Sequence, residues 1–240
     1  MTSTRLNNVT LTKSIIIGTY AFAKHSENAA SGSAPSAFRW TVVVRSGESE
    51  DEDLSEYIQR IEFNLHSTFA QPRRVVEMPP FQLEEQGWGE FEIRLRIFFQ
   101  DSNERPLELK HWLRLRPDEN DFEAMKVDYT KQPLVHEQLE DIVFNSPHEW
   151  FYEKLVKPSN RTSLIPSGLI PQAKISQHPL RAFMKPIEEW RQEEKESEKN
   201  LLEIEEFLRT QISQHQNQIL LVDSEYRAYR DHFHKYNLSG

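Results

Sequence analysis

The stretch Phe91-Glu92-Ile93-Arg94-Leu95-Arg96-Ile97 decides the fold class of this chain. Apolar and charged residues alternate strictly in it, which is the pattern of a β-strand with one buried face and one solvated face. The turn-forming residues Asn103–Pro106 follow, and Leu107–Leu115 then alternates in the same way. The two alternating segments therefore predict a pair of antiparallel strands.

More strands are predicted on the N-terminal side of this pair. Val9–Phe22 and Phe38–Arg45 are rich in β-branched residues, Ile58–Leu65 alternates, and Arg74–Glu77 is short and extended. Short strands separated by turn signals at this spacing are typical of an antiparallel sandwich. The fold class predicted for residues 6–117 is therefore an all-β, immunoglobulin-like sandwich.

The pattern changes after Pro117, and residues 118–156 are predicted to form a short helical extension. Its helices are expected at Val135–Phe144 and Pro147–Val156. Proline suits the first helical position, and Ser146 would then be the N-cap residue.

Residues 157–185 are predicted to be a linker, because this part of the chain is rich in proline and has no hydrophobic period. Residues 186–236 are predicted to form an α-helical coiled coil. Glycine and proline are absent there, and apolar residues recur at steps of three and four from Leu201 to Phe233. A solvated single helix or a partly disordered tail is the alternative. We favour the coiled coil because so long and polar a helix cannot be buried alone.

Composition excludes several function classes. The net charge is −9, which disfavours non-specific binding to nucleic-acid phosphates and favours basic partners such as histone tails. The chain has no cysteine, so thiol nucleophiles, disulfides and cysteine-based zinc sites are excluded. No apolar run approaches the roughly 18 residues of a membrane span, and Met1–Asn8 is polar. We therefore expect a soluble intracellular protein without a membrane partner.

Catalytic motifs are also missing. The sequence contains no HExxH, GxSxG or GxxxxGK[ST] pattern. We expect no catalytic residues, no metal site and no cofactor.

Five short motifs follow one another between the predicted strands. They are Leu65-His66-Ser67-Thr68-Phe69, Pro79-Pro80-Phe81, Gly87-Trp88-Gly89-Glu90-Phe91, Phe98-Phe99 and Asn103-Glu104-Arg105-Pro106. Together with Trp40 and His111, their order and spacing over about Leu6 to Arg116 resemble the YEATS domain. With the coiled coil added, the chain resembles the GAS/Yaf-type branch of that family, which histone-acetyltransferase and variant-histone-exchange complexes share.

The resemblance implies a site for acylated lysine, whose flat neutral amide needs apolar faces and hydrogen-bond donors. Phe69 and Trp88 would supply the faces, and the Thr68 hydroxyl and the Trp88 backbone N–H would bind the acyl carbonyl. The implied site residues are His66, Thr68, Phe69, Gly87, Trp88 and Gly89, with Phe38 and Ser67 at the rim. His66 would order its loop, and the two glycines would let the backbone approach the ligand.

Simpler interpretations remain for several of these residues. Phe69 could belong to the core, Thr68 could stabilise a turn, and His66 could be a structural histidine. Phe38 stands where many relatives have histidine, so selectivity among tail sequences is expected to differ. Trp40 and His111 are assigned to the fold.

The resemblance further implies a non-enzymatic nuclear reader of acetyl-lysine or crotonyl-lysine on histone tails. Its coiled coil would dock into chromatin-remodelling and histone-acetyltransferase complexes that act in transcription regulation and DNA repair. A structural scaffold with weak or no acyl-lysine binding is the alternative. A weak contact with DNA is a further expectation, through the basic residues Arg94, Arg96, Arg114 and Arg116.

Overall fold

The computed structural model describes residues 4–24, 37–156 and 178–237. The chain divides into two compact units, Met1–Ile187 and Glu188–Gly240.

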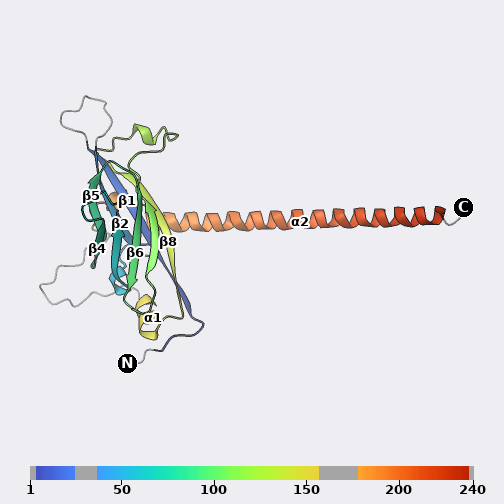
Figure 1. Ribbon diagram of the computed structural model, residues 1–240, viewed down its shortest axis with the longest axis horizontal. Helices are drawn as coiled ribbons and strands as arrows, with labels where there is room; N and C mark the ends of the chain where they lie inside the picture. Colours follow the sequence, from blue (N-terminus) through green and yellow to red (C-terminus); the bar gives the residue numbers. More distant parts are fainter. Residues whose placement is uncertain (1–3, 25–36, 157–177, 238–240) are drawn as a thin grey trace. The chain divides into compact units, whose positions relative to one another are not determined.

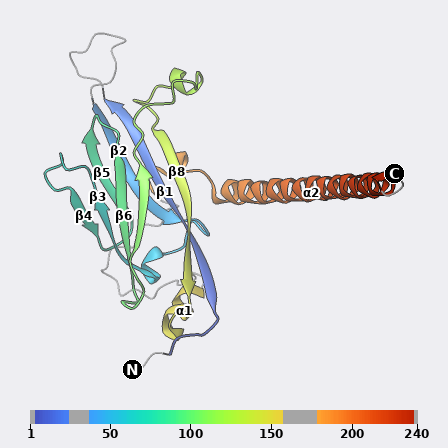
Figure 2. The same ribbon diagram turned by 45° about the vertical axis from the view of Figure 1, so that its right-hand side comes forward.

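The first unit is built on two antiparallel sheets of four strands each (Figures 1 and 2). The first sheet has the order β5-β2-β1-β8 and consists of β1 (Thr10–Lys24), β2 (Ala37–Ser46), β5 (Phe81–Gly87) and β8 (Leu134–Asn145). The second sheet has the order β4-β3-β6-β7 and consists of β3 (Ile58–Asn64), β4 (Arg73–Val76), β6 (Glu92–Phe99) and β7 (Leu107–Trp112). The predicted all-β sandwich is confirmed.

Short helical segments connect or follow the strands. They are the 3-10 helices η1 (Leu54–Glu56), η2 (Ala124–Lys126) and η4 (Arg181–Phe183), and the α-helix α1 (Glu149–Val156). The second unit holds most of the long helix α2 (Ile187–Asn237).

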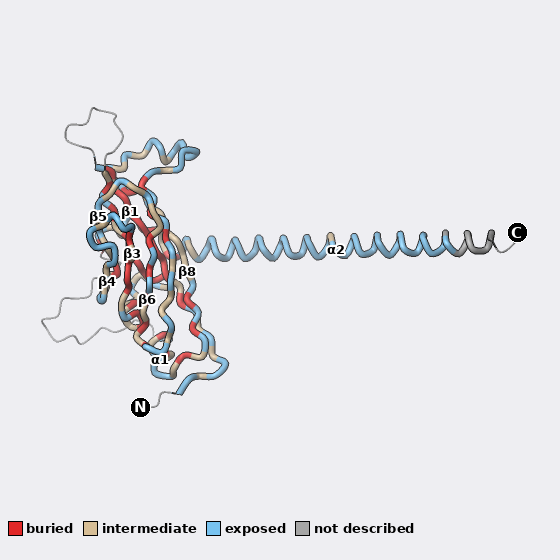
Figure 3. Tube along the Cα trace, viewed as in Figure 1, coloured by how far each residue is buried: buried red, intermediate tan, exposed pale blue. Residues whose placement is uncertain are grey.

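The core lies between the two sheets and follows the alternation of the strands (Figure 3). In β6, Ile93, Leu95 and Ile97 are buried, whereas Arg94 and Arg96 are exposed. Removing such apolar side chains from water contributes about 25 cal/mol per Å² of area buried, so this face holds the sheets together.

Strand β8 corrects the sequence analysis, which predicted a helix at Val135–Phe144. The segment instead pairs with β1 from Leu134 to Asn145, and Ile142 and Phe144 point into the core. Pairing with a strand more than a hundred residues earlier overrides local preference and is invisible in a local pattern. The sandwich therefore extends beyond residue 117.

Three further details differ from the sequence-based expectation. Phe81–Gly87 was not expected to be a strand, yet β5 pairs with β2. Helix α1 begins at Glu149, not at Pro147. Ser146 has a φ of 50° and donates its N–H to the carbonyl of Val9, so it ends the β1–β8 ladder and does not cap a helix.

The predicted linker lies partly outside the described residues, which resume at His178. Residues 178–187, here called the strap, pack on the outer face of the first sheet. Met184 is buried against Tyr20 and Val43, and the ring of Phe183 meets Phe22 edge-on at 6.1 Å between centroids. The assignment of residues 178–185 to a linker is therefore wrong, because this segment buries apolar side chains.

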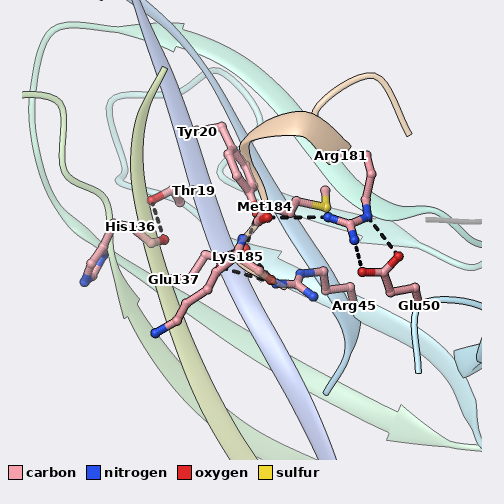
Figure 4. A network of polar contacts seen from close by, with 9 residues as sticks. All are labelled: Thr19, Tyr20, Arg45, Glu50, His136, Glu137, Arg181, Met184 and Lys185. Atoms are coloured by element: carbon pink, nitrogen blue, oxygen red, sulfur yellow. Dashed lines mark hydrogen bonds and ion pairs between the residues drawn. The ribbon is translucent and has the colours of Figure 1, made fainter. Parts of the chain in front are cut away.

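A buried ion pair anchors the strap (Figure 4). Arg45 and Glu137 lie 3.0 Å apart, and each side chain is only 3% exposed. Glu137 also accepts hydrogen bonds from the hydroxyl of Tyr20 and from the backbone N–H of Lys185, the latter at 3.2 Å. Arg45 donates to the carbonyl of Lys185 at 2.7 Å. The backbone N–H and the backbone carbonyl of Lys185 are thus both hydrogen-bonded to the ion pair, which holds the strap on the sheet.

Helix α2 confirms the predicted helix over 51 residues. Its large apolar side chains are exposed wherever their burial is described from Leu201 onward (Figure 3). They include Leu201, Leu202, Ile204, Phe207, Leu208, Ile212, Ile219, Leu220, Leu221, Val222 and Tyr226. That this helix forms a coiled coil stays a prediction.

Candidate functional site

The loop after β3 carries the first group of predicted site residues. The Phe69 N–H donates to the carbonyl of His66 at 3.1 Å, which closes a tight turn, and Leu65 N–H donates to Pro72 O at 2.7 Å across the base of the loop. His66, Ser67 and Thr68 are exposed, whereas Phe69 is half-buried. This short loop places polar groups in solvent beside an aromatic ring.

The polar groups of this turn contact one another. His66 Nδ1 lies 3.0 Å from Thr68 Oγ1 and 3.4 Å from the Thr68 nitrogen. Because Nδ1 accepts the Thr68 backbone N–H, the ring proton lies on Nε2, and the Thr68 hydroxyl donates to Nδ1. His66 therefore holds the Thr68 hydroxyl in one orientation.

Phe69 belongs to a block of aromatic rings. It meets Trp40 edge-on, with ring centroids 6.2 Å apart, and lies 5.7 Å from Phe91. Phe91 in turn contacts Trp40 at 6.0 Å and His66 at 6.1 Å. Such aromatic contacts fix ring orientation as well as burying area. The sandwich therefore holds the ring of Phe69 in place, although this side chain is only half-buried.

The loop between β5 and β6 carries the second group of site residues. Trp88 is 74% exposed. Glu90 holds this loop by accepting N–H bonds from Leu115 at 2.7 Å and from Arg116 at 2.9 Å, and Leu113 N–H donates to Phe91 O at 3.0 Å. The tryptophan thus projects from a loop whose base is tied to the segment after β7.

The two loops meet at Gly87. A Cβ added there would lie 3.7 Å from Trp40 Nε1 and 3.8 Å from Phe69 Cζ, which is ordinary contact, and a Cβ at Gly89 would meet nothing within 4 Å. Neither glycine has a left-handed φ. The backbone itself therefore does not demand glycine here, and the expected close approach of a ligand stays a prediction.

Phe38 occupies a different place from the one expected. It pairs with Gly87 across β2 and β5, but its side chain is only 3% exposed. The Arg116 guanidinium lies 5.6 Å from its ring centroid. Phe38 is therefore a core residue beneath the site and not an exposed aromatic rim, since the sheet turns its side chain inward.

The structure brings the other predicted residues to one end of the sandwich, on two loops and, for Gly87, at the end of β5. Among the described residues, no ring contact joins Trp88 to Phe69. Phe91 was missed as a site residue because the alternation of its strand already accounted for it. Trp40, assigned to the fold, is fully buried, yet its indole N–H has no hydrogen-bond partner among the described residues.

His111 lies in β7, where it pairs with Ile93 of β6. It is 1% exposed and contacts Thr19 Oγ1 at 3.2 Å. Burial, and after it the charge of the neighbouring His136, lowers the pKa of His111 to about 4. His111 is therefore neutral near pH 7 and is a buried group, in keeping with its assignment to the fold.

Three further features concern metal ions, membranes and basic patches in the part of the chain that the structure describes. No group of three or more His, Asp or Glu side chains is arranged to hold a metal ion there. No described helix has the length and apolar character needed to cross a membrane. Arg94 and Arg96, expected in a basic patch, are paired with Glu92 at 2.9 Å and Glu108 at 3.5 Å.

The sequence profile of the YEATS family matches residues 36–117, the segment that holds both loops. The Kluyveromyces lactis "Protein AF-9 homolog" is 36% identical over 179 residues, which cover 70% of this chain and 77% of that protein. The Arabidopsis thaliana "Transcription initiation factor TFIID subunit 14b" is 34% identical over 166 residues, covering 68% of this chain and 58% of that protein.

One similar solved structure is described as "Crystal structure of the Yaf9 YEATS domain bound to H3K27ac". It is 33% identical, covers 63% of this chain and 96% of that chain, and has a TM-score of 0.49. The sandwich, the ordered motifs on its end loops and the extent of the match to the K. lactis protein lead to one conclusion. This chain belongs to the YEATS family.

Proposed function

We propose that this chain is a non-enzymatic reader of acylated lysine on histone tails. One observation carries the proposal. Two loops at the same end of a rigid sandwich present a half-buried ring, Phe69, an exposed ring, Trp88, and a hydroxyl held by a histidine. A solvated tryptophan on a short, tied loop has no packing role and is the kind of side chain that binding surfaces use.

The chemistry of the ligand fits this arrangement. An acyl-lysine head is flat and neutral, so it can lie between aromatic faces at little cost. A charged ammonium would first have to lose its hydration water, which costs more free energy. Its carbonyl needs a donor, because an unpaired buried amide costs about 1–3 kcal/mol. The donors proposed here are the backbone N–H of Trp88 and the Thr68 hydroxyl, which would exchange its bond to His66 Nδ1 for one to the ligand. Gly87 and Gly89 would leave room for the acyl group beside them.

The wider biological role is proposed on different grounds. Helix α2 exposes an apolar series that includes Leu208 and Ile219, and one relative is named as a subunit of a transcription initiation factor. We infer that α2 docks the reader into nuclear chromatin-remodelling and histone-acetyltransferase complexes that act in transcription and DNA repair. Leu208→Lys/Ile219→Lys should then release the chain from its complex in a pull-down while peptide binding persists.

The full chain should be used to test the reading function, because β8 and the strap are part of the first unit. A fluorescent H3K27ac peptide, the ligand named for the solved Yaf9 domain, is a suitable probe. We expect micromolar or weaker affinity, because a single small head contributes few contacts, and at least tenfold weaker binding of the unmodified peptide. Trp88→Ala should abolish the difference between the two peptides.

A matched control is Trp112→Ala, which removes another exposed tryptophan from β7. It should leave peptide binding unchanged. Equal binding of acetylated and unmodified peptides by the wild-type chain would rule out the reading function and favour the scaffold alternative.

A further inference from the structure

The end of the sandwich that carries the loops of Phe69 and Trp88 is here called the reading end. An apolar groove of about 280 Å³ lies beside it, outside the site described above. Val127, Tyr129, Leu134 and Val135 line it together with Phe183 of the strap. Val135 is 38% exposed although it is a β-branched aliphatic residue in a strand. The groove therefore offers a place for an apolar side chain from another segment.

Backbone contacts connect this groove to the acyl-lysine site in one row. Gly87 pairs with Phe38, Phe38 pairs with Ala23, and Ala23 N–H donates to the carbonyl of Tyr129 at 2.8 Å. Neighbouring strands lie about 4.8 Å apart, so three such steps span roughly 15 Å. An extended peptide covers that distance in about four to five residues.

The loop that forms one wall of the groove has a marked charge. Residues 117–133 carry five carboxylates, at Asp118, Glu119, Asp121, Glu123 and Asp128, against two lysines, at Lys126 and Lys131. Both lysines are already paired with carboxylates of the loop, at 2.6 Å and 2.9 Å. Apolar side chains are exposed among these charges, since Phe122 is 74% and Met125 is 57% exposed. This wall is complementary to a segment with both basic and apolar residues.

We propose that the groove binds the stretch of the same histone tail that lies four to six residues from the acylated lysine. An apolar side chain of the tail would enter the groove, and its lysines or arginines would face the loop carboxylates. The inference rests on the proposed reading function and adds a second subsite, which selects among acylated lysines by their neighbours.

Two peptides separate this subsite from the first one. The short peptide holds acetyl-lysine with one residue on each side and capped ends, and the long peptide holds six native histone residues on each side. For the wild-type full chain we expect the long peptide to bind about five- to tenfold more tightly at low salt. Each exposed charge pair increases the affinity by only a small factor, which limits the expected difference. High salt should screen these pairs and reduce the preference for the long peptide.

Glu119→Lys/Glu123→Lys should remove most of this advantage and leave the short peptide unaffected. Val135→Lys should act in the same direction by filling the groove with a positive charge. Glu194→Lys/Glu198→Lys on α2 changes the net charge equally and should change neither affinity.

Equal affinity of the two peptides for the wild-type chain would overturn the subsite, as would loop variants that keep the advantage. A different result would be that the loop variants lower recovery of the complex in a pull-down while keeping the preference for the long peptide. That result would mean that another subunit occupies the groove, and the proposal would be wrong. If the wild-type chain fails to distinguish acetylated from unmodified long peptides, the reading function itself fails.

Discussion

The loops at the reading end and the network that holds the strap (Tyr20, Arg45, Glu137 and Lys185, here called the strap network) both combine aromatic rings with polar groups. They differ in how far these groups are exposed to solvent. At the reading end Trp88 is 74% exposed, and His66 and Thr68 are exposed beside it. In the strap network Tyr20 is fully buried, and the side chains of Arg45 and Glu137 are each 3% exposed.

This difference in exposure suits the strap network to stabilising the fold and the reading end to binding. Buried charges are tolerable only when they are paired and hydrogen-bonded, and the strap supplies both a backbone donor and a backbone acceptor for that purpose. An exposed ring and an exposed hydroxyl contribute little to folding and stay accessible to a ligand. Substitutions in the strap network should therefore change stability, whereas substitutions at the reading end should change binding.

The largest expected effect is in the strap network. Glu137→Ala would leave the buried guanidinium of Arg45 without its carboxylate, and breaking a buried pair on one side costs about 3–5 kcal/mol. We expect a loss of this size in the free energy of unfolding, measured by urea denaturation of the full chain.

The matched control is Glu108→Ala, whose carboxylate pairs with Arg96 on the surface with 77% exposure. Surface pairs contribute about 0–1 kcal/mol, so this variant should be close to wild type. Equal losses for the two variants would remove the distinction between the regions.

A smaller effect is expected at the reading end. Thr68→Val keeps the shape of the side chain and removes its hydroxyl, so acetyl-lysine peptide should bind about fivefold more weakly, corresponding to about 1 kcal/mol for one hydrogen bond. Stability should stay within about 0.5 kcal/mol of wild type, because Thr68 is exposed. Calorimetric titration and thermal melting measure the two quantities. A change in stability without a change in affinity would assign this hydroxyl to the turn.

The smallest effect concerns pH and the start of the strap. His178 Nδ1 accepts the Leu180 N–H at 3.1 Å, so its other nitrogen carries the proton toward Gln82. Burial lowers the pKa of His178. As the pH falls, His178 is therefore protonated in the unfolded chain before it is protonated in the folded chain. The free energy of unfolding should then fall as the pH drops from about 6.5 toward the pKa of the folded state.

His178→Gln should reduce that acid sensitivity, as judged by urea unfolding at pH 7 and pH 5. An unchanged difference between the two pH values would show that His178 is not the group that responds. Variants at the reading end should keep the full acid sensitivity of the wild-type chain.

The sequence predicted those parts of the molecule that local alternation specifies. Phe91–Ile97 matches β6 to within two residues at its end, and the sandwich and α2 are confirmed. It failed at β8 and at the strap, because both owe their structure to distant partners. The strand lies against β1, and the strap lies against Tyr20 and Val43. A proline-rich segment gives no local sign that it will be held by a buried ion pair.

For the candidate site, the loops were predictable from the sequence, whereas the contacts of their residues were not. The motifs correctly indicated loops at Phe69 and Trp88, which lie at one end of the sandwich. They did not indicate that Phe38 is buried under Arg116, nor that Phe91 packs on Phe69. Burial depends on how two sheets face each other, and a single strand pattern cannot specify it.

The pairing of β1 with β8 also has a consequence for how the protein folds. Thr10 pairs with Asn145 and Ala21 with Leu134, so β1 is synthesised more than a hundred residues before its partner strand β8. At typical rates of synthesis this delay is roughly ten seconds. Until then one edge of β1 is uncovered, and such an edge can pair with other chains. We expect folding to be slow and dominated by long-range contacts, and the nascent chain to need protection from aggregation until β8 has been made.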